Sequence, residues 1–259
     1  NDILIPAKEG GYAVGLFNAV NVEMARAIIE TAEELKAPVI VGTAEVLTPA
    51  MSLERVAEYL IPMAQKASVP VCVHFDHGLT FDMCMEALKL GYRSIMYDCS
   101  TDSYEENVRK VKEMAAIAHS RGATIEGELG HVGDNEGSAE GSSHLADPSA
   151  YFTDPKMAKD FVERTGVDAL AIAIGTAHGA YKSKPKLDFD RLKEIATIVK
   201  AADKLSAYIK CVEEQKAGNT EFDSAEKQTK KILKSLKMPE MDWFMENCLD
   251  AFSLNIDQL

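Results

Sequence analysis

The sequence predicts an α/β fold of the (β/α)8, or TIM-barrel, type that lacks its last two strands. Short apolar runs, several of them apolar at successive positions, are each followed by a longer stretch with helical periodicity. Six such units in a row favour a barrel over a doubly wound sheet, although a barrel needs eight strands to close. The expected strands are residues 13–18, 38–43, 69–76, 93–98, 123–128 and 168–176.

Amphipathic helices are expected between these strands and throughout the carboxyl-terminal part of the chain. Each of the helical stretches between strands follows or opens on a residue that can cap a helix. Beyond Asp190 no further strand is expected, so we predict a barrel domain at residues 1–198 and an all-helical segment at residues 199–259. The expected helices are residues 21–35, 52–67, 103–121, 191–217 (one helix, or two joined near Lys200), 224–236, and a last one opened by Pro239.

Composition and charge exclude several classes of partner. The chain has 259 residues, 46% of them hydrophobic, and a formal net charge of −13. A field of that sign repels phosphate backbones and anionic lipids, so neither nucleic acid nor a membrane is an expected partner. No apolar run approaches the roughly 18 residues that cross a bilayer, and no leader pattern opens the chain. Five scattered cysteines without a CxxC pair indicate reduced thiols, and we expect a soluble cytoplasmic protein.

Polar residues that suit metal chemistry lie where four of the predicted strands end. In a barrel the reactive groups gather at the carboxyl ends of the strands. A single histidine is more often structural than a ligand, but His77 and His178 both precede a glycine at such an end, beside acids. A catalytic zinc ion takes nitrogen and oxygen ligands and keeps one position open for substrate. The strand ends are Val73 to Gly78, Tyr97 to Ser100, Glu126 to His131, and Gly175 to Gly179.

Residues 11–195 resemble the class II fructose- and tagatose-bisphosphate aldolases almost throughout. The resemblance implies a metal-dependent aldolase that cleaves a ketose 1,6-bisphosphate, fructose or tagatose, to dihydroxyacetone phosphate and glyceraldehyde 3-phosphate through a zinc-stabilised enediolate. The motifs that carry it are Tyr12 to Asn18 with Glu23, Asp76 to Gly78, Ser94 to Ser100, Glu126 to Gly130, and Gly166 to Gly179 continuing to Tyr181 and to Lys186–Phe189.

The same resemblance implies a ligand set for the zinc cofactor. His77 and His178 match the histidines that bind the catalytic zinc in this family. Asp98 and Glu128 match carboxylates that lie near the metal and hold it in an alternative buried position. The expected metal site is therefore these four residues.

Further residues match the family's catalytic and substrate-binding positions. Asp76 corresponds to the group that exchanges a proton with a substrate oxygen, and Asn18 to a residue that contacts the enediolate. Glu136, in a glycine-rich loop expected to be mobile, is the nearest match to the acid/base for the carbon-bound proton; a solvated loop acid is the alternative interpretation. Substrate binding is expected at Gly179, Lys182 and Ser100.

The sequence departs from this family after the helix that begins near Asp188. The family has a seventh strand that supplies a third zinc histidine in a glycine-rich turn, but no histidine follows His178 here, and Gly218 is the one glycine after Gly179. Residues 199–259 instead resemble the carboxyl-terminal helices of bacterial HD-domain 5'-deoxynucleotidases. The matching stretches are Lys200 to Cys211, with Asp203 at a metal-ligand position, Ala217 to Asn219, Met241 to Glu246, and Phe252 to Asp257.

Three functional interpretations follow from these observations. The first is the zinc-dependent aldolase, with a small phosphorylated sugar as its partner. The second is a metal-dependent nucleotide phosphohydrolase built around Asp203. The third is a non-catalytic or chimeric barrel protein. Because a barrel without two strands exposes sheet edges and apolar faces, we expect a homo-oligomer, either a dimer or a tetramer.

Overall fold

The computed structural model describes residues 2–134, 151–178, 184–247 and 249, apart from the side chains of residues 133, 134, 202, 203, 206 and 240. The chain forms two compact units. The first contains Asn1–Phe152 and Arg164–Lys182, and the second contains Thr153–Glu163 and Ser183–Leu259. The two units are described separately below.

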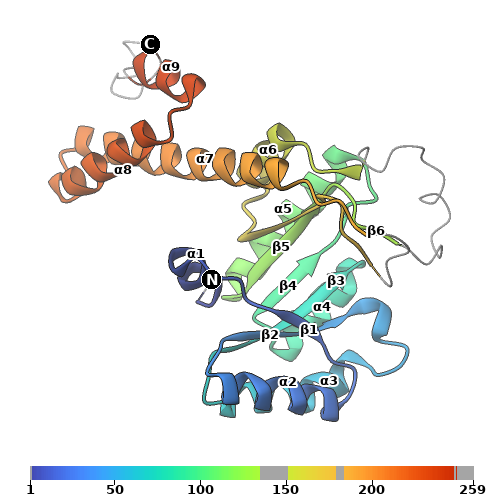
Figure 1. The fold of residues 1–259 in the computed structure, drawn as a ribbon. Helices are drawn as coiled ribbons and strands as arrows, with labels where there is room; N and C mark the ends of the chain where they lie inside the picture. The colour runs from blue at the N-terminus through green and yellow to red at the C-terminus, as the bar shows by residue number, and fades with distance from the viewer. Residues whose placement is uncertain (1, 135–150, 179–183, 248, 250–259) are drawn as a thin grey trace. The chain divides into compact units, whose positions relative to one another are not determined.

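The first unit is built on a curled sheet of six parallel strands (Figure 1). Each strand pairs in parallel with the next one in the order β1-β2-β3-β4-β5-β7. The predicted α/β class and the six predicted strands in this part of the chain are therefore confirmed. The strands are β1 (Leu16–Asn18), β2 (Val39–Ala44), β3 (Val71–Gly78), β4 (Ser94–Tyr97), β5 (Thr124–Leu129) and β7 (Ala169–Ile172), and two short strands, β6 (Gly133–Asp134) and β8 (Ala177–His178), pair separately.

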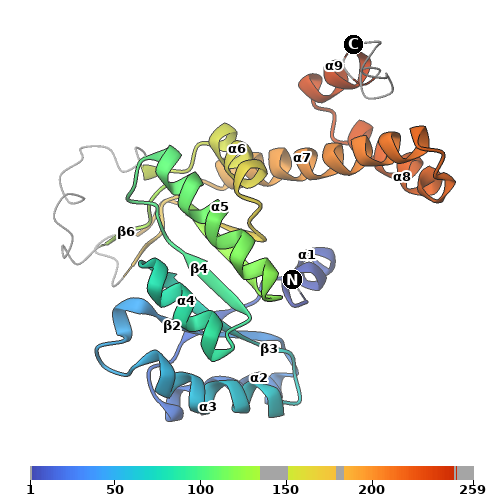
Figure 2. The same cartoon turned by 180° about the vertical axis from the view of Figure 1, so that it is seen from behind.

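Helices connect successive strands and cover one face of the sheet. Seen from behind, α4 and α5 lie across that face, and α2 and α3 lie side by side next to β2 and β3 (Figure 2). Asn21 caps α2 by accepting the Met24 amide, and Thr80 caps α4 by accepting the Met83 amide, as sequence capping rules expect. The helices are α1 (Leu4–Gly10), α2 (Val22–Leu35), α3 (Leu53–Lys66), α4 (Phe81–Leu90) and α5 (Tyr104–Ser120).

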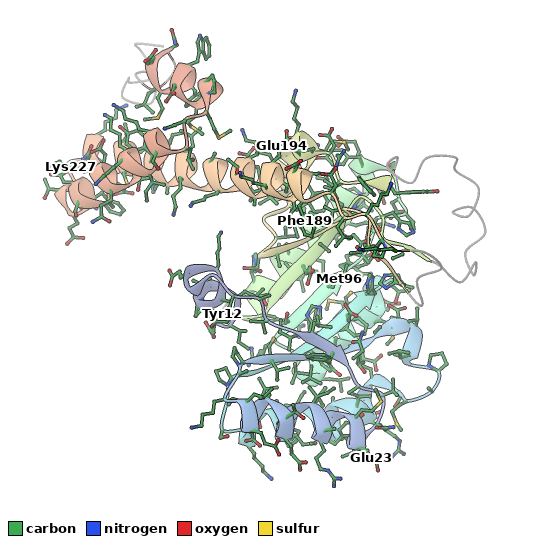
Figure 3. The ribbon with its side chains drawn as sticks, in the orientation of Figure 1. Tyr12, Glu23, Met96, Phe189, Glu194 and Lys227 are labelled. Carbon is green, nitrogen blue, oxygen red and sulfur yellow. The ribbon has the colours of Figure 1, made fainter. Side chains whose placement is uncertain are left out.

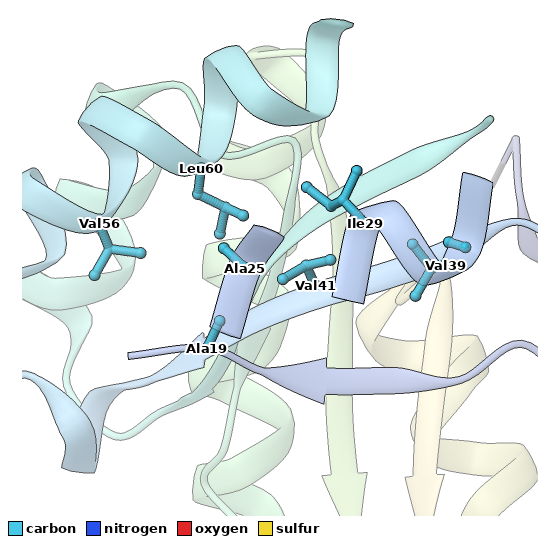
Figure 4. Packing of buried hydrophobic residues seen from close by; sticks show 8 residues of the cluster. Ala19, Ala25, Ile29, Val39, Val41, Val56 and Leu60 are labelled. Atoms are coloured by element: carbon cyan, nitrogen blue, oxygen red, sulfur yellow. The ribbon is translucent and has the colours of Figure 1, made fainter. Parts of the chain in front are cut away.

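The apolar core between α2, α3 and β2 fixes these strands in place. Ile29 from α2, Leu60 from α3 and Val41 from β2 are buried and meet in one cluster (Figure 4). Each comes from a position that the periodicity of its element turns inward, which is every third or fourth residue in a helix and every second in a strand. Burial of this apolar area is the main stabilising contribution to the β1–β3 end of the sheet.

Both edges of the sheet are open within the part of the chain that the structure describes. There β1 pairs with β2 alone, and β7 pairs with β5 alone. Large apolar side chains are exposed beside the first edge: Phe17 in β1 is 52% accessible, and Tyr12, in the segment that precedes β1, is 48% accessible. Tyr12 lies on the segment that leads into β1 (Figure 3). This is the exposed edge expected of a barrel with two strands fewer than eight.

The second unit is helical. The stretch expected as one helix or two is a single helix, α7 (Phe189–Lys216), which Asp188 caps by accepting the Arg191 amide. Its Tyr208 packs with Leu233 and Met241 in a small core, and the Tyr208 hydroxyl donates to Glu226 at 2.8 Å. Among the described helices, none combines the length and apolar composition that a membrane span requires. The other elements of this part are α6 (Pro155–Thr165), η3 (Thr220–Phe222), α8 (Asp223–Ser235) and α9 (Pro239–Asn247).

Candidate metal centre and its surroundings

An irregularity in β3 aims His77 at the carboxyl end of the sheet. Phe75 pairs with Ile95 and Gly78 with Tyr97, so β3 has one more residue than β4 between these two pairs. The backbone of His77 takes a φ of 42°, a left-handed conformation that side chains rarely adopt. A bulge of this kind redirects a side chain that regular alternation would place on the other face, and such bulges are frequent beside active sites.

Glycine is required at the end of this bulge. A Cβ atom on Gly78 would lie 2.7 Å from the Met96 carbonyl oxygen and 2.6 Å from the Cys84 sulfur. The loop that follows is held by Glu45, the residue directly after β2, whose carboxylate accepts the Leu79 and Thr80 amides at 2.7 and 3.0 Å. The backbone around His77 is thus fixed by the close packing of Gly78 and by the Glu45 carboxylate, which holds the next two amides.

His77, Asp98 and Glu128 form a cluster whose potential ligand atoms all lie within 4.8 Å of one another. The three residues come from β3, from the residue after β4, and from β5. His77 Nδ1 lies 2.8 Å from Asp98 Oδ2 and 4.0 Å from Glu128 Oε2. While Nδ1–H donates to Asp98, Nε2 is the ring nitrogen that remains for a metal. Imidazole nitrogen and carboxylate oxygen are both donor types that fit a divalent first-row cation.

The charges in this cluster perturb one another. Burial lowers the pKa of His77, but the hydrogen bond to Asp98 and the nearby carboxylates outweigh it and raise the pKa to about 9. Burial raises the pKa of Asp98, but its hydrogen bonds with His77 and Ser100 outweigh burial and lower it. Burial and the charge of Asp98 raise the pKa of Glu128 to about 7. Such opposed shifts within one small cluster are typical of functional sites.

His178 lies beside this cluster. Its strand β8 pairs with β6, where His178 is opposite Asp134. The ring centroids of His77 and His178 are 5.1 Å apart, with the planes at 77°. The two histidines singled out in the sequence are therefore neighbours, although 100 residues separate them along the chain.

Asn18 and Asp76 contact each other across the sheet. Asn18 Nδ2, at the end of β1, donates to Asp76 Oδ2 at 2.7 Å. Gly42 lies between them on β2, opposite Asn18 in the strand pairing. A Cβ atom at Gly42 would stand 2.6 Å from Asn18 Oδ1, so a side chain there would push the amide out of place. Glycine at this position leaves Asn18 the space to reach Asp76.

Ser100 joins the cluster to a histidine that the sequence analysis did not assign to the site. The Ser100 amide donates to Asp98 Oδ1 at 3.0 Å, and its hydroxyl lies 3.3 Å from His131 Nδ1. The His131 amide donates to the Tyr151 carbonyl, and the two rings are 6.1 Å apart. His131 directly follows Glu128, Leu129 and Gly130 at the end of a strand, and this position could have assigned it to the site from the sequence.

Two further inward-facing residues went unassigned in the sequence, His74 and Glu126. Side chains two apart on a strand share a face, so His74 accompanies Asp76 and Glu126 accompanies Glu128. Applying this period of two to the strand-end motifs would have identified both. Three predicted site residues, Glu136, Gly179 and Lys182, lie outside the described residues, as does the side chain of Asp203.

The fold and the cluster together define a parallel α/β protein with a candidate divalent-cation site at the carboxyl ends of its strands. The chain belongs to the class II fructose-bisphosphate aldolase family, whose model matches residues 1–212.

Individual relatives agree with this assignment. A fructose-bisphosphate aldolase from Thermus caldophilus is 43% identical over 206 residues, which are 77% of this chain and 65% of that protein. One from Staphylococcus aureus strain Mu50 is 42% identical over 198 residues, covering 75% and 67%. The chain thus spans about two thirds of the length of the curated relatives it matches.

Solved structures show the same likeness. The YdjI aldolase from Escherichia coli K12 superposes with a TM-score of 0.67 at 28% identity, covering 98% of each chain. Fructose-bisphosphate aldolase from Campylobacter jejuni superposes with a TM-score of 0.63 at 26% identity, covering 80% of this chain and 64% of that one. The similarity of residues 199–259 to nucleotidase helices stays a prediction.

Proposed function

We propose that this protein is a zinc-dependent aldolase that cleaves a ketose 1,6-bisphosphate, fructose or tagatose, to dihydroxyacetone phosphate and glyceraldehyde 3-phosphate. The observation that carries the proposal is the grouping of His77, Asp98 and Glu128, with His178 beside them, at the carboxyl ends of parallel strands in a member of this family. The location is that of active sites in β/α barrels generally.

The zinc ion would be held by His77 and His178, with Asp98 and Glu128 as nearby carboxylates. A bound divalent cation supplies Lewis acidity that polarises a substrate carbonyl. Asp98 also accepts the Nδ1–H of His77 and thereby orients the ring, an arrangement typical of metal-ligating histidines. The ordinary zinc preference for nitrogen and oxygen ligands supports zinc over a harder cation.

Asp76 would exchange the proton of the substrate hydroxyl. The hydrogen bond from Asn18 fixes Oδ2, so the carboxylate presents a defined geometry to the substrate. In the cleavage direction Asp76 takes the proton from the hydroxyl on carbon 4, the bond between carbons 3 and 4 breaks, and its electron pair remains with the carbon next to the ketone. Glu136 is proposed to return a proton to that carbon, and Asn18 to contact the enediolate.

Substrate contacts and assembly complete the proposal. Ser100 contacts the cluster through Asp98, and Gly179 and Lys182, the other proposed substrate contacts, follow His178 in the sequence. We propose a homo-oligomer, dimer or tetramer, because Tyr12 and Phe17 are exposed beside an open sheet edge. We also propose cytoplasmic residence, because the cysteines are scattered and form no CxxC pair. Sedimentation velocity would show a single monomeric species if the assembly proposal is wrong.

The cleavage proposal is tested by a coupled assay of triose phosphate release with fructose and tagatose bisphosphates in parallel. We expect activity in the purified protein, loss after chelation, and recovery on adding zinc. His77→Ala is expected to lose both zinc and activity. His119→Ala is a matched control, since His119 is an exposed histidine whose Nε2 pairs with Asp168. Folded protein that takes up zinc but cleaves neither sugar contradicts the proposal.

A further inference from the structure

His74 is a buried histidine close to the candidate site that the mechanism above does not use. It lies in β3, two residues before Asp76 on the same inner face, and its side chain is 3% accessible. Its Nδ1 lies 2.8 Å from the Ser94 hydroxyl, and Ser94 is its pairing partner on β4. Its Nε2 is buried with no hydrogen-bond partner among the described residues.

The unpartnered nitrogen faces two carboxylates. His74 Nε2 is 3.9 Å from Asp76 Oδ1 and 3.8 Å from Glu126 Oε2. Both distances exceed a direct hydrogen bond and suit one water molecule shared between the three groups. His74, Ser94 and Glu126, but not Asp76, line a cavity of about 990 Å³, so water can reach the His74 ring from that side.

The groups on either side of the His74 ring determine which of its nitrogens carries the proton. Carboxylate oxygens accept hydrogen bonds, so the nitrogen that faces them serves best as a donor. Ser94 can donate its hydroxyl proton to Nδ1, which leaves the proton on Nε2. Burial lowers the pKa of His74 to about 4, so the ring is neutral near pH 7. One arrangement of protons therefore satisfies both sides of the ring.

We propose that His74 is a positioning residue whose neutral Nε2–H form, fixed by Ser94, holds the Asp76 carboxylate through a water shared with Glu126. Asp76 would then be oriented from two sides, with Asn18 bound to Oδ2 and His74 facing Oδ1. The expected effect of His74 on catalysis rests on the proposed function of Asp76. The position of the proton on His74 and the coupling between His74 and Asp76 are independent of that proposed function.

The first test needs no activity. In protein labelled with ¹⁵N at histidine, long-range proton–nitrogen correlation spectra distinguish protonated from unprotonated ring nitrogens, and His74→Gln identifies the His74 signals by their loss. We expect a protonated Nε2 and an unprotonated Nδ1. Asp76→Asn should shift the Nε2–H signal, whereas Asp102→Asn, at an exposed acid paired with Lys110, should leave it in place. The opposite tautomer, or a signal indifferent to Asp76→Asn, overturns the proposal.

The second test separates the two ring nitrogens by kinetics. A glutamine amide reaches the position of Nε2, whereas an asparagine amide reaches only that of Nδ1. We expect His74→Asn to lower kcat by about tenfold or more with KM and zinc content unchanged, because a small displacement of a reacting group is costly. His74→Gln should retain most of kcat. Val73→Ala, next to His74 on the opposite face of β3, is the control for a general change in packing.

The outcomes distinguish this proposal from the proposed function. If the unmodified protein cleaves neither sugar, the aldolase proposal fails, and the spectra still decide whether His74 donates toward Asp76. If the protein is active and His74→Asn and His74→Gln have the same kcat, the positioning role is wrong while the aldolase proposal stands.

Discussion

Gly42 shows how one residue without a side chain controls two others. It lies on β2 between Asn18 and the β3 strand that carries Asp76, and a methyl group there would contact Asn18 Oδ1 at 2.6 Å. The amide of Asn18 is the far end of a side chain and can rotate away, so the fold tolerates the change while the hydrogen bond to Asp76 is lost. The absence of a side chain at Gly42 therefore serves the hydrogen bond between Asn18 and Asp76 more than the stability of the fold.

We predict that Gly42→Ala lowers kcat about tenfold, equivalent to roughly 1.4 kcal/mol of transition-state stabilisation, with little change in thermal stability. Steady-state kinetics with zinc analysis measures this. The double variant Gly42→Ala/Asn18→Ala should be no slower than Asn18→Ala alone, because both changes remove the same contact. Additive losses would show that Gly42 acts by another route.

At the scale of elements, α5 supports the strand that carries Glu128. The Asn107 side chain is buried and its Nδ2 donates to the Glu128 carbonyl at 2.9 Å. This bond ties the first turns of α5 to the end of β5, where the cluster lies. Removal of the amide leaves a buried carbonyl without that donor.

We expect Asn107→Ala to lower the free energy of unfolding by about 1–3 kcal/mol and to weaken zinc binding. Urea denaturation and competition with a zinc indicator measure the two effects. Glu113→Ala, on the exposed face of the same helix, provides the control and should be close to neutral in both assays. Unchanged zinc affinity in Asn107→Ala would mean that the position of Glu128 does not depend on this bond.

The core between α2, α3 and β2 gives a second prediction at this scale. Leu60 is fully buried in the cluster, whereas Leu35, at the end of α2, is 71% accessible. Leu60→Ala should cost about 2–5 kcal/mol of stability through lost burial and a residual cavity. Leu35→Ala should change it by less than about 0.5 kcal/mol. Equal effects in urea denaturation would show that this cluster is not the core of the β1–β3 region.

At the scale of the whole molecule, a metal ion would join strands that are distant in sequence. His77, Asp98 and Glu128 belong to three neighbouring segments at one end of the sheet, so a bound cation adds links between them. Both edges of the sheet are open among the described residues, so such links can add to its stability. Metal binding should therefore contribute to stability as well as to chemistry.

We predict that zinc at 100 times its dissociation constant stabilises the folded protein by about 2.7 kcal/mol and that chelation removes this contribution. For a protein of this size that corresponds to a fall in Tm of roughly 5–10 °C. Differential scanning calorimetry with and without chelator measures it. His77→Ala should unfold at the same temperature under both conditions. A chelator effect that persists in His77→Ala would place the stabilising metal elsewhere.

The sequence by itself determined the strands and helices of this fold. Apolar runs and helical periodicity predicted six parallel strands and the helices between them, because both patterns arise locally from backbone geometry and from the transfer of apolar side chains out of water. The strand-end motifs singled out His77 and His178, since parallel strands present their carboxyl ends at one edge. Asp98 and Glu128 came only from the resemblance to the aldolase family. Whether residues 191–217 form one helix was left open, because a single residue such as Lys200 carries no decisive break.

Only the tertiary structure decided how these groups meet. The bulge in β3 and the left-handed backbone of His77 depend on the register with β4, which is a contact between distant parts of the chain. The direction of His74 Nε2 toward Asp76 and Glu126 depends on β3 and β5, and on Ser94 of β4 at the other ring nitrogen. Such distances follow from the pairing and twist of the sheet, and no local pattern of residues contains them.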